Sequence, residues 1–101
     1  MRAIDRVIAS IKAAMPGMAV RQLQVAHPGD DSGLWFFTHP GSRVEVNVES
    51  SDGEFPFLIE NSENGIRMTT TTDEDTIAAV SLVMGIQRRT IPGSTSRAGP
   101  A

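Results

Sequence analysis

The chain has 101 residues, a net charge of −3 and no cysteine. A chain of this length builds one hydrophobic core, and a chain without cysteine forms neither disulfide bonds nor thiolate metal sites. We therefore expect a single domain over residues 1–89 that folds by burying apolar side chains, without thiol chemistry.

The N-terminal residues predict a helix over residues 3–14. Apolar residues recur there at helical spacing and form one core-facing stripe, made of Ile4, Val7, Ile8, Ile11 and Met15. Pro16 disfavours helical backbone in the residue before it, and Gly17 suits the left-handed exit from a helix. Charged residues interrupt the apolar run, so we expect no signal peptide, no membrane span and a cytoplasmic protein.

Residues 18–26 predict a first strand, in which Leu23 and Val25 lie on one side and Gln22 and Gln24 on the other. Residues 27–33 consist of turn formers and polar residues, and predict a loop. The chain then enters its aromatic centre, residues 33–60, which contains the single Trp and all four Phe residues.

Three turn signals divide the next part of the chain into four strands: Pro40-Gly41, Asp52-Gly53 and Asn64-Gly65. Residues that face each other across antiparallel strands lie on the same side of the sheet, so short turns fix which residues share a face. One pair from each hairpin states the predicted register: Trp35 with Val46, Val48 with Phe57, and Asn61 with Met68. One face then collects the predicted core: Trp35, Phe37, Val44, Val46, Val48, Phe57, Ile59, Ile66 and Met68.

The opposite face of the sheet is the candidate binding surface. No remaining part of so short a chain is predicted to cover it, although it carries apolar anchors among charged residues. The predicted partner-binding residues are Phe36, Glu45, Asn47, Glu49, Leu58 and Glu60. The register places Glu45 directly opposite Glu60, and like charges in that position favour a partner carrying Arg or Lys. Self-association, a shifted register or simple exposure of scattered apolar residues would also account for this pattern.

A second helix is predicted from Asp73, with Thr72 as its N-cap and an end between Gly85 and Arg88. Its buried stripe comprises Ile77, Val80, Val83 and Met84, with Gln87 as a further candidate. Residues 90–101 show no periodicity and contain two prolines, so we expect a disordered tail. The predicted fold is α+β in two layers: an antiparallel meander of about five strands, with both helices on one face.

Charge is unevenly distributed along the chain. Residues 43–63 carry six acidic residues against one arginine, a net charge of −5, whereas residues 1–27 have a net charge of +3. An acidic sheet argues against nucleic-acid binding, because phosphate contacts need a basic face with exposed aromatic residues. The charge also promotes solubility.

Other site chemistry is weakly supported. His27 and His39 each precede Pro-Gly, and Asp30 and Asp31 follow the first histidine, but this spacing matches no closed zinc motif. Glu45 and Glu60 would form an acid–base pair only in a pocket that splits their pKa values. We therefore expect no metal, no cofactor and no catalytic residue, with a small enzyme kept as an alternative.

The segments GLWFF and VNVESSDGEFPFLIE, separated by a short polar hairpin, resemble small bacterial proteins of unknown activity. Some of these look like immunity proteins, which neutralise toxins delivered between competing bacteria. The resemblance implies a cytoplasmic, non-enzymatic binding protein. An acidic sheet with a few apolar anchors is compatible with a basic toxin domain as its partner. The alternative is a homodimeric adaptor similar to the small acidic chaperones of secretion systems, whose usual element order inserts a helix within the sheet.

Overall fold

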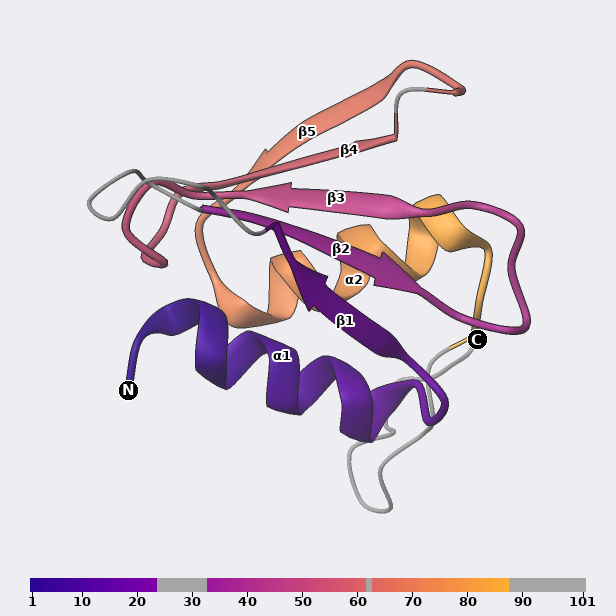
Figure 1. Ribbon diagram of the computed structural model, residues 1–101, viewed down its shortest axis with the longest axis horizontal. Helices are drawn as coiled ribbons and strands as arrows, with labels where there is room; N and C mark the ends of the chain where they lie inside the picture. Colours follow the sequence, from indigo (N-terminus) through magenta and orange to yellow (C-terminus); the bar gives the residue numbers. More distant parts are fainter. Residues whose placement is uncertain (24–32, 62, 88–101) are drawn as a thin grey trace, which may run out of the picture.

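The computed structural model describes residues 1–23, 33–61 and 63–87. The elements, in chain order, are α1 (Ala3–Ala14), β1 (Ala19–Gln22), β2 (Leu34–Thr38), β3 (Val46–Glu49), β4 (Phe57–Asn61), β5 (Ile66–Thr70) and α2 (Asp73–Met84). The strands form one antiparallel sheet in sequence order, and the helices pack on one of its faces (Figure 1). The predicted two-layer α+β meander is confirmed.

The hydrophobic core lies between the sheet and the two helices. Six residues of the predicted inner face are buried: Trp35, Phe37, Val46, Val48, Phe57 and Ile59. Val44, Ile66 and Met68 are only partly buried at its margin. From the helices, the core receives residues that include Ile4, Val7, Ile11, Ile77 and Val80. Each large side chain contributes roughly 2 kcal/mol by leaving water, so these contacts drive folding.

The sheet register differs from the predicted one by two residues in each hairpin, which leaves the two faces unchanged. Trp35 faces Val48 and not Val46, and Val48 faces Ile59 and not Phe57. Asn61 likewise faces Ile66 and not Met68. A shift of two residues preserves side-chain alternation, so every inward residue stays inward. The predicted pairs were wrong, and the predicted faces are right.

The β2–β3 and β3–β4 connections are longer than predicted, and both contact the helical part of the molecule. In the β2–β3 connection, residues 39–45, the Ser42 hydroxyl donates to the backbone carbonyl of Met84 at 2.9 Å and accepts from the backbone N–H of Val44 at 3.0 Å. The His39 ring donates from Nε2 to the Pro16 carbonyl at 2.8 Å, and its Nδ1 accepts from the Gly41 N–H at 2.9 Å. These bonds anchor the connection to α2 and to the end of α1.

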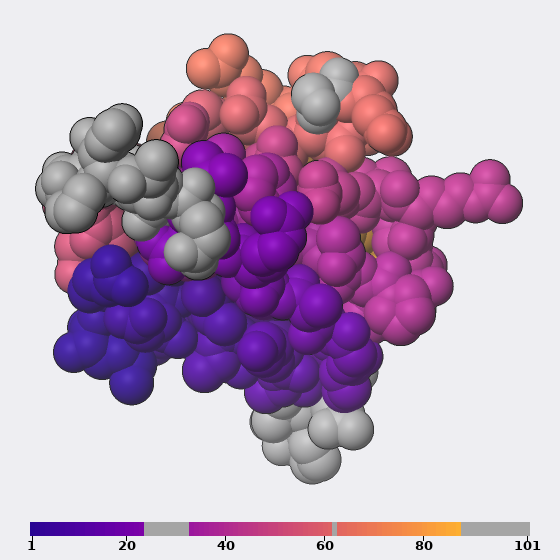
Figure 2. Space-filling model, in the orientation of Figure 1, coloured from indigo at the N-terminus to yellow at the C-terminus, as the bar shows by residue number. Residues whose placement is uncertain are grey.

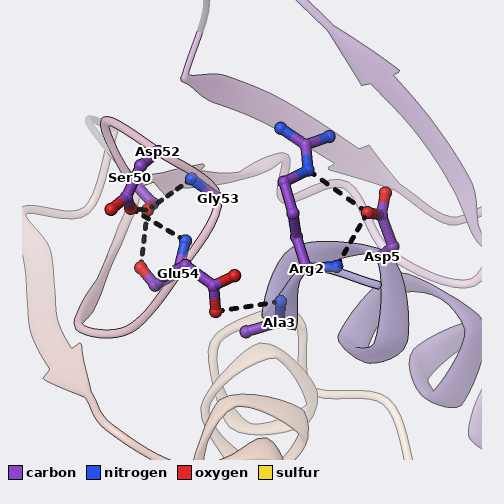
Figure 3. A network of polar contacts seen from close by, with 7 residues as sticks. All are labelled: Arg2, Ala3, Asp5, Ser50, Asp52, Gly53 and Glu54. Carbon is purple, nitrogen blue, oxygen red and sulfur yellow. Dashed lines mark hydrogen bonds and ion pairs between the residues drawn. The ribbon is translucent and has the colours of Figure 1, made fainter.

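The β3–β4 connection, residues 50–56, caps the first turn of α1. The backbone N–H of Ile4 donates to the Gly53 carbonyl at 2.8 Å. Figure 3 shows the second bond, in which the N–H of Ala3 donates to the Glu54 carboxylate at 3.3 Å. The first N–H groups of a helix have no partner within it, so these bonds satisfy groups that would otherwise be unpaired. Inside the connection, the buried Ser50 hydroxyl accepts from the Gly53 N–H at 3.1 Å and donates to the Glu54 carbonyl at 2.6 Å.

The helix ends follow the sequence signals. α1 ends at Ala14, before Pro16-Gly17. The Thr72 hydroxyl accepts from the Asp75 N–H at 3.1 Å, and Gly85 ends α2 in the left-handed conformation. Gln87 is exposed and does not extend the buried stripe.

Two predicted segments extend beyond the part of the chain that the structure describes. The first predicted strand runs to residue 26, whereas β1 ends at Gln22 and residues 24–32 are not described. The predicted tail, residues 90–101, lies wholly outside the described residues.

An ion pair joins the two helices at their N-terminal ends. The Arg6 guanidinium contacts both carboxylate oxygens of Asp73, at 2.6 and 2.8 Å. The hydrogen bonds from Arg6 lower the pKa of Asp73 below its usual value of 3.8, more than its slight burial raises it. The pair fixes α2 beside α1 on the shared face of the sheet.

The capping contact predicts that Gly53→Ala destabilises the fold more than Gly65→Ala. Both glycines have positive φ, +78° and +73°, so the left-handed backbone cost of about 1 kcal/mol is common to both. A Cβ at Gly53 would lie 3.0 Å from Cγ2 of Ile4, whereas one at Gly65 meets nothing within 4 Å. We expect losses of roughly 2–4 and 1 kcal/mol in urea unfolding. Equal losses in the free energy of unfolding would show that the connection moves away from α1 at little cost to make room for the added Cβ.

The Arg6–Asp73 pair predicts a pH-dependent stability difference between the wild type and Asp73→Asn. Because the pKa of Asp73 is lowered on folding, the contribution of the pair is present above pH 3.8 and is lost as the pH falls through the lower folded-state value. The difference in the free energy of unfolding between the wild type and Asp73→Asn should therefore shrink as the pH falls. Asp75→Asn is the control, since it removes a first-turn charge without touching Arg6. The same convergence in the control would assign the effect to the helix dipole alone.

Candidate functional site

The outer face of the sheet is the face opposite the helices. In the view of Figure 2 the strands stand in front and α2 is almost wholly hidden behind them. Among the described residues, no helix or strand packs over this face. Its side chains form two rows that cross the strands, and the pairing of the strands defines both.

The first row is polar apart from one aromatic residue. It runs across all five strands through Arg21, Phe36, Asn47, Glu60 and Arg67. The Arg21 guanidinium carbon lies 4.4 Å from the centre of the Phe36 ring, a cation–π contact. At the other end, Arg67 approaches the Glu60 carboxylate to 3.7 Å. At one end of the row Arg21 is therefore stacked on a ring, and at the other end the charges of Glu60 and Arg67 compensate each other.

The second row is mainly apolar. It runs through Leu34, Glu49, Leu58 and Thr69, and Leu23 joins it because the Leu23 N–H donates to the Leu34 carbonyl at 2.8 Å. This row forms the floor of an open hollow of about 600 Å³, to which the β3–β4 connection adds a rim. The hollow is lined by Leu23, Gly33, Leu34, Glu49, Ser50, Ser51, Pro56, Phe57, Leu58 and Thr69.

Glu49 is the charged residue of the hollow. Its side chain is exposed, while the leucines on either side of it, Leu34 and Leu58, are half-buried. Among the described residues, none forms an ion pair with Glu49. A carboxylate between apolar neighbours suits a ligand that combines an apolar body with a positive charge.

Five of the six predicted binding residues lie on the outer face, in two separate rows. Phe36, Asn47 and Glu60 belong to the first row, and Glu49 and Leu58 to the second. The sixth, Glu45, is exposed in the β2–β3 connection just before β3.

The predicted pairing of Glu45 with Glu60 was wrong, because the register shift puts Asn47 opposite Glu60. Two facing glutamates therefore do not mark the site for a cationic partner. The acidic residue of the outer face without an ion pair among the described residues is Glu49. Glu45 and Glu60, the candidate acid–base pair, therefore do not face each other, and Glu60 lies beside Arg67.

Asn47 occupies the centre of the first row and of the sheet. Its side-chain oxygen is shielded from solvent and has no hydrogen-bond partner among the described residues. A buried acceptor without a donor costs about 1–3 kcal/mol, and Asn is a poor strand former. We therefore expect the side chain of Asn47 to lower the stability of the sheet.

Histidine and acidic residues form no metal site in the part of the chain that the structure describes. There, no group of three or more His, Asp or Glu side chains could hold an ion. Both ring nitrogens of His39 bond to backbone groups, so this histidine holds the β2–β3 connection. His27, Asp30 and Asp31 lie outside the described residues. Among the helices described, none is long and apolar enough to cross a membrane.

Sequence reasoning missed the contribution of β1 to the site. Arg21 and Leu23 each extend one row, yet the loop after β1 gives no turn from which to pair the strand. The helpful signal was the alternation within residues 19–23, which places Arg21 and Leu23 on one side.

Comparisons with protein-family models, curated proteins and solved structures find no match for this chain.

The unpaired oxygen of Asn47 predicts that Asn47→Val stabilises the protein by about 1 kcal/mol. Valine removes the buried acceptor and favours the strand. Thr69→Val, on the exposed outer face of the edge strand β5, is the matched control and should change the free energy of unfolding little. Chemical unfolding measures both. A loss of stability in Asn47→Val would mean that the amide makes a stabilising contact in solution.

Proposed function

We propose that this chain is a non-enzymatic protein-binding module, and that the outer face of its sheet binds a toxin domain in the manner of an immunity protein. The observation that carries the proposal is the open hollow of the second row, an apolar floor with an uncompensated carboxylate in its middle. The resemblance of residues 33–60 to immunity-type proteins supplies the class of partner.

The apolar part of the hollow supports binding to a protein surface. Leu34 and Leu58 flank Glu49 from the strands on its two sides, and Pro56 adds apolar surface at the rim. A few apolar anchors that lose water at the centre of an interface carry most of its binding energy. Phe36, held under Arg21 in the next row, extends this anchor surface.

The charge of the site selects the partner. Since Arg21 and Arg67 are engaged by Phe36 and Glu60, the carboxylate of Glu49 is the group that a partner's Lys or Arg would complement. The aliphatic stem of such a residue fits the leucines, while its charged head reaches the carboxylate. Nuclease-type toxins expose basic residues around their active sites, and an acidic surface that covers them blocks substrate and speeds association.

The two alternatives are less well supported. The adaptor alternative depends on a family whose sheet contains an inserted helix, whereas the described residues between these five strands form none. The enzyme alternative rested on Glu45 and Glu60, which do not face each other.

Co-expression tests the proposal. Any toxin-like domain found in the reading frames next to this gene is expressed in cells that carry the wild type, Glu49→Lys or Glu63→Lys, and survival is scored. Wild type should protect, and Glu49→Lys should not, because it places a cation where the partner has one. Association measured with the purified toxin domain should slow about tenfold at low salt in Glu49→Lys.

Glu63→Lys is the matched control, because it makes the same charge change at an exposed turn away from the hollow. It should protect as well as the wild type. Wild type that neither protects nor binds would remove the immunity function. Full protection by Glu49→Lys would leave the function standing but reject the hollow as its site.

A further inference from the structure

The second row of the outer face crosses the strands, and the hollow extends along all of it. The lining of the hollow includes every member of the row, from Leu23 beside β1 through Leu34, Glu49 and Leu58 to Thr69 on β5. Paired residues on neighbouring strands lie one strand spacing apart, about 4.8 Å. The row is therefore about 19 Å long, with Glu49 at its middle.

The centre of the row repeats at an interval that a helix can match. Leu34 and Leu58 lie one strand spacing from Glu49 on either side, so the two leucines are about 10 Å apart. Along one side of a helix, residues i and i+7 are separated by about 10.5 Å, and residue i+3 or i+4 lies between them. A helix that crosses the strands therefore places three side chains over Leu34, Glu49 and Leu58.

An extended segment fits the same row less well. Residues on one side of a strand are about 6.7 Å apart, so three of them span about 13 Å. If the middle residue lies over Glu49, each outer residue overshoots its leucine by about 2 Å. The β3–β4 connection forms a rim beside the row, with Ser51 and Pro56 in the lining. The row thus favours a helix that runs along this rim.

The carboxylate of Glu49 sets the charge of the helix. In the part of the chain that the structure describes, no residue forms an ion pair with Glu49, and the lining of the hollow contains no Lys, Arg or His. A Lys or Arg at the middle position would donate to this carboxylate, while its aliphatic stem packs on the leucines beside it. The helix therefore has apolar residues at i and i+7 and a basic residue at i+3 or i+4.

Helices α1 and α2 are already engaged with the other face of the sheet. Each buries an apolar stripe in the core, through residues that include Ile4, Val7, Ile77 and Val80. A second copy of the described residues would bring the same two helices, engaged in the same way. The helix that covers the hollow is therefore one that a different protein supplies.

We propose that the hollow binds an amphipathic helix of the partner protein, which crosses the strands over the second row and places a Lys or Arg on Glu49. The inference rests on the proposed function for the existence of a protein partner. It adds the element that the partner presents, about 13 residues long, and the spacing of the three residues that make the contact. Insertion of an amphipathic helix into an apolar groove is a common mode of recognition.

A designed peptide tests the proposal without the toxin. The probe is an alanine-based peptide of about 14 residues with Leu at i and i+7 and Arg at i+4, held helical by a staple on its other side and labelled with a fluorophore at one end. Fluorescence anisotropy is recorded as the full chain is titrated into the peptide. We expect saturable binding with a Kd of about 100 μM, because two apolar side chains and one ion pair make the contact.

Matched changes in the chain and in the peptide test the role of the charge. Glu49→Lys should raise the Kd about tenfold, whereas Glu63→Lys, the same change at an exposed turn, should leave it unchanged. Moving the Arg of the peptide to position i+2 keeps its composition, turns the charge away from Glu49 and should weaken binding by a similar factor. Circular dichroism checks that both chain variants are folded.

A helical peptide that fails to bind the wild type, or that binds Glu49→Lys equally well, overturns the proposal. An extended peptide with Leu, Arg and Leu at i, i+2 and i+4 that binds more tightly than the helical one overturns it too. A chain that protects cells from the toxin but does not bind the helical peptide keeps the immunity function and loses the helix. A chain that binds the peptide but does not protect keeps the helix and loses the toxin.

Discussion

The structure depends on a hydrogen-bonded contact between two segments that are distant in sequence. The first N–H groups of α1 have no partners within the helix, and the β3–β4 connection supplies them from Gly53 and Glu54. This contact places the helix over the buried face of the sheet and fixes the length of the connection. The length of the connection then sets which residues pair across β3 and β4, and its outer side forms the rim of the hollow.

The sequence alone predicts the faces of the sheet and the helices, but not the register. Trp35, Phe37, Val46 and Val48 alternate with polar residues, and that alternation assigns each side chain to a face whatever the loop lengths. The dipeptide Asp52-Gly53 predicts a two-residue turn, and that turn gives the wrong register for β3 and β4. The connection instead has seven residues and contacts Ile4 and Ala3. Local turn preferences do not predict such a tertiary contact.

For the candidate site too, the sequence predicts which residues share a face but not how they pair. Phe36, Asn47, Glu49, Leu58 and Glu60 lie on the outer face as predicted, because face membership follows from alternation alone. Which of these charges is compensated depends on pairing, and so the sequence pointed to Glu45 and Glu60 where the structure isolates Glu49.

Strand β3 illustrates how the two sides of a sheet divide the demands made on a sequence. Its four residues alternate between the buried core, Val46 and Val48, and the open face, Asn47 and Glu49. A substitution at the first pair changes the packing of the core, whereas a substitution at the second pair changes the surface of the open face. Neighbouring codons in this strand should therefore evolve at different rates, with apolar residues retained at every second position and the positions between them freer to vary.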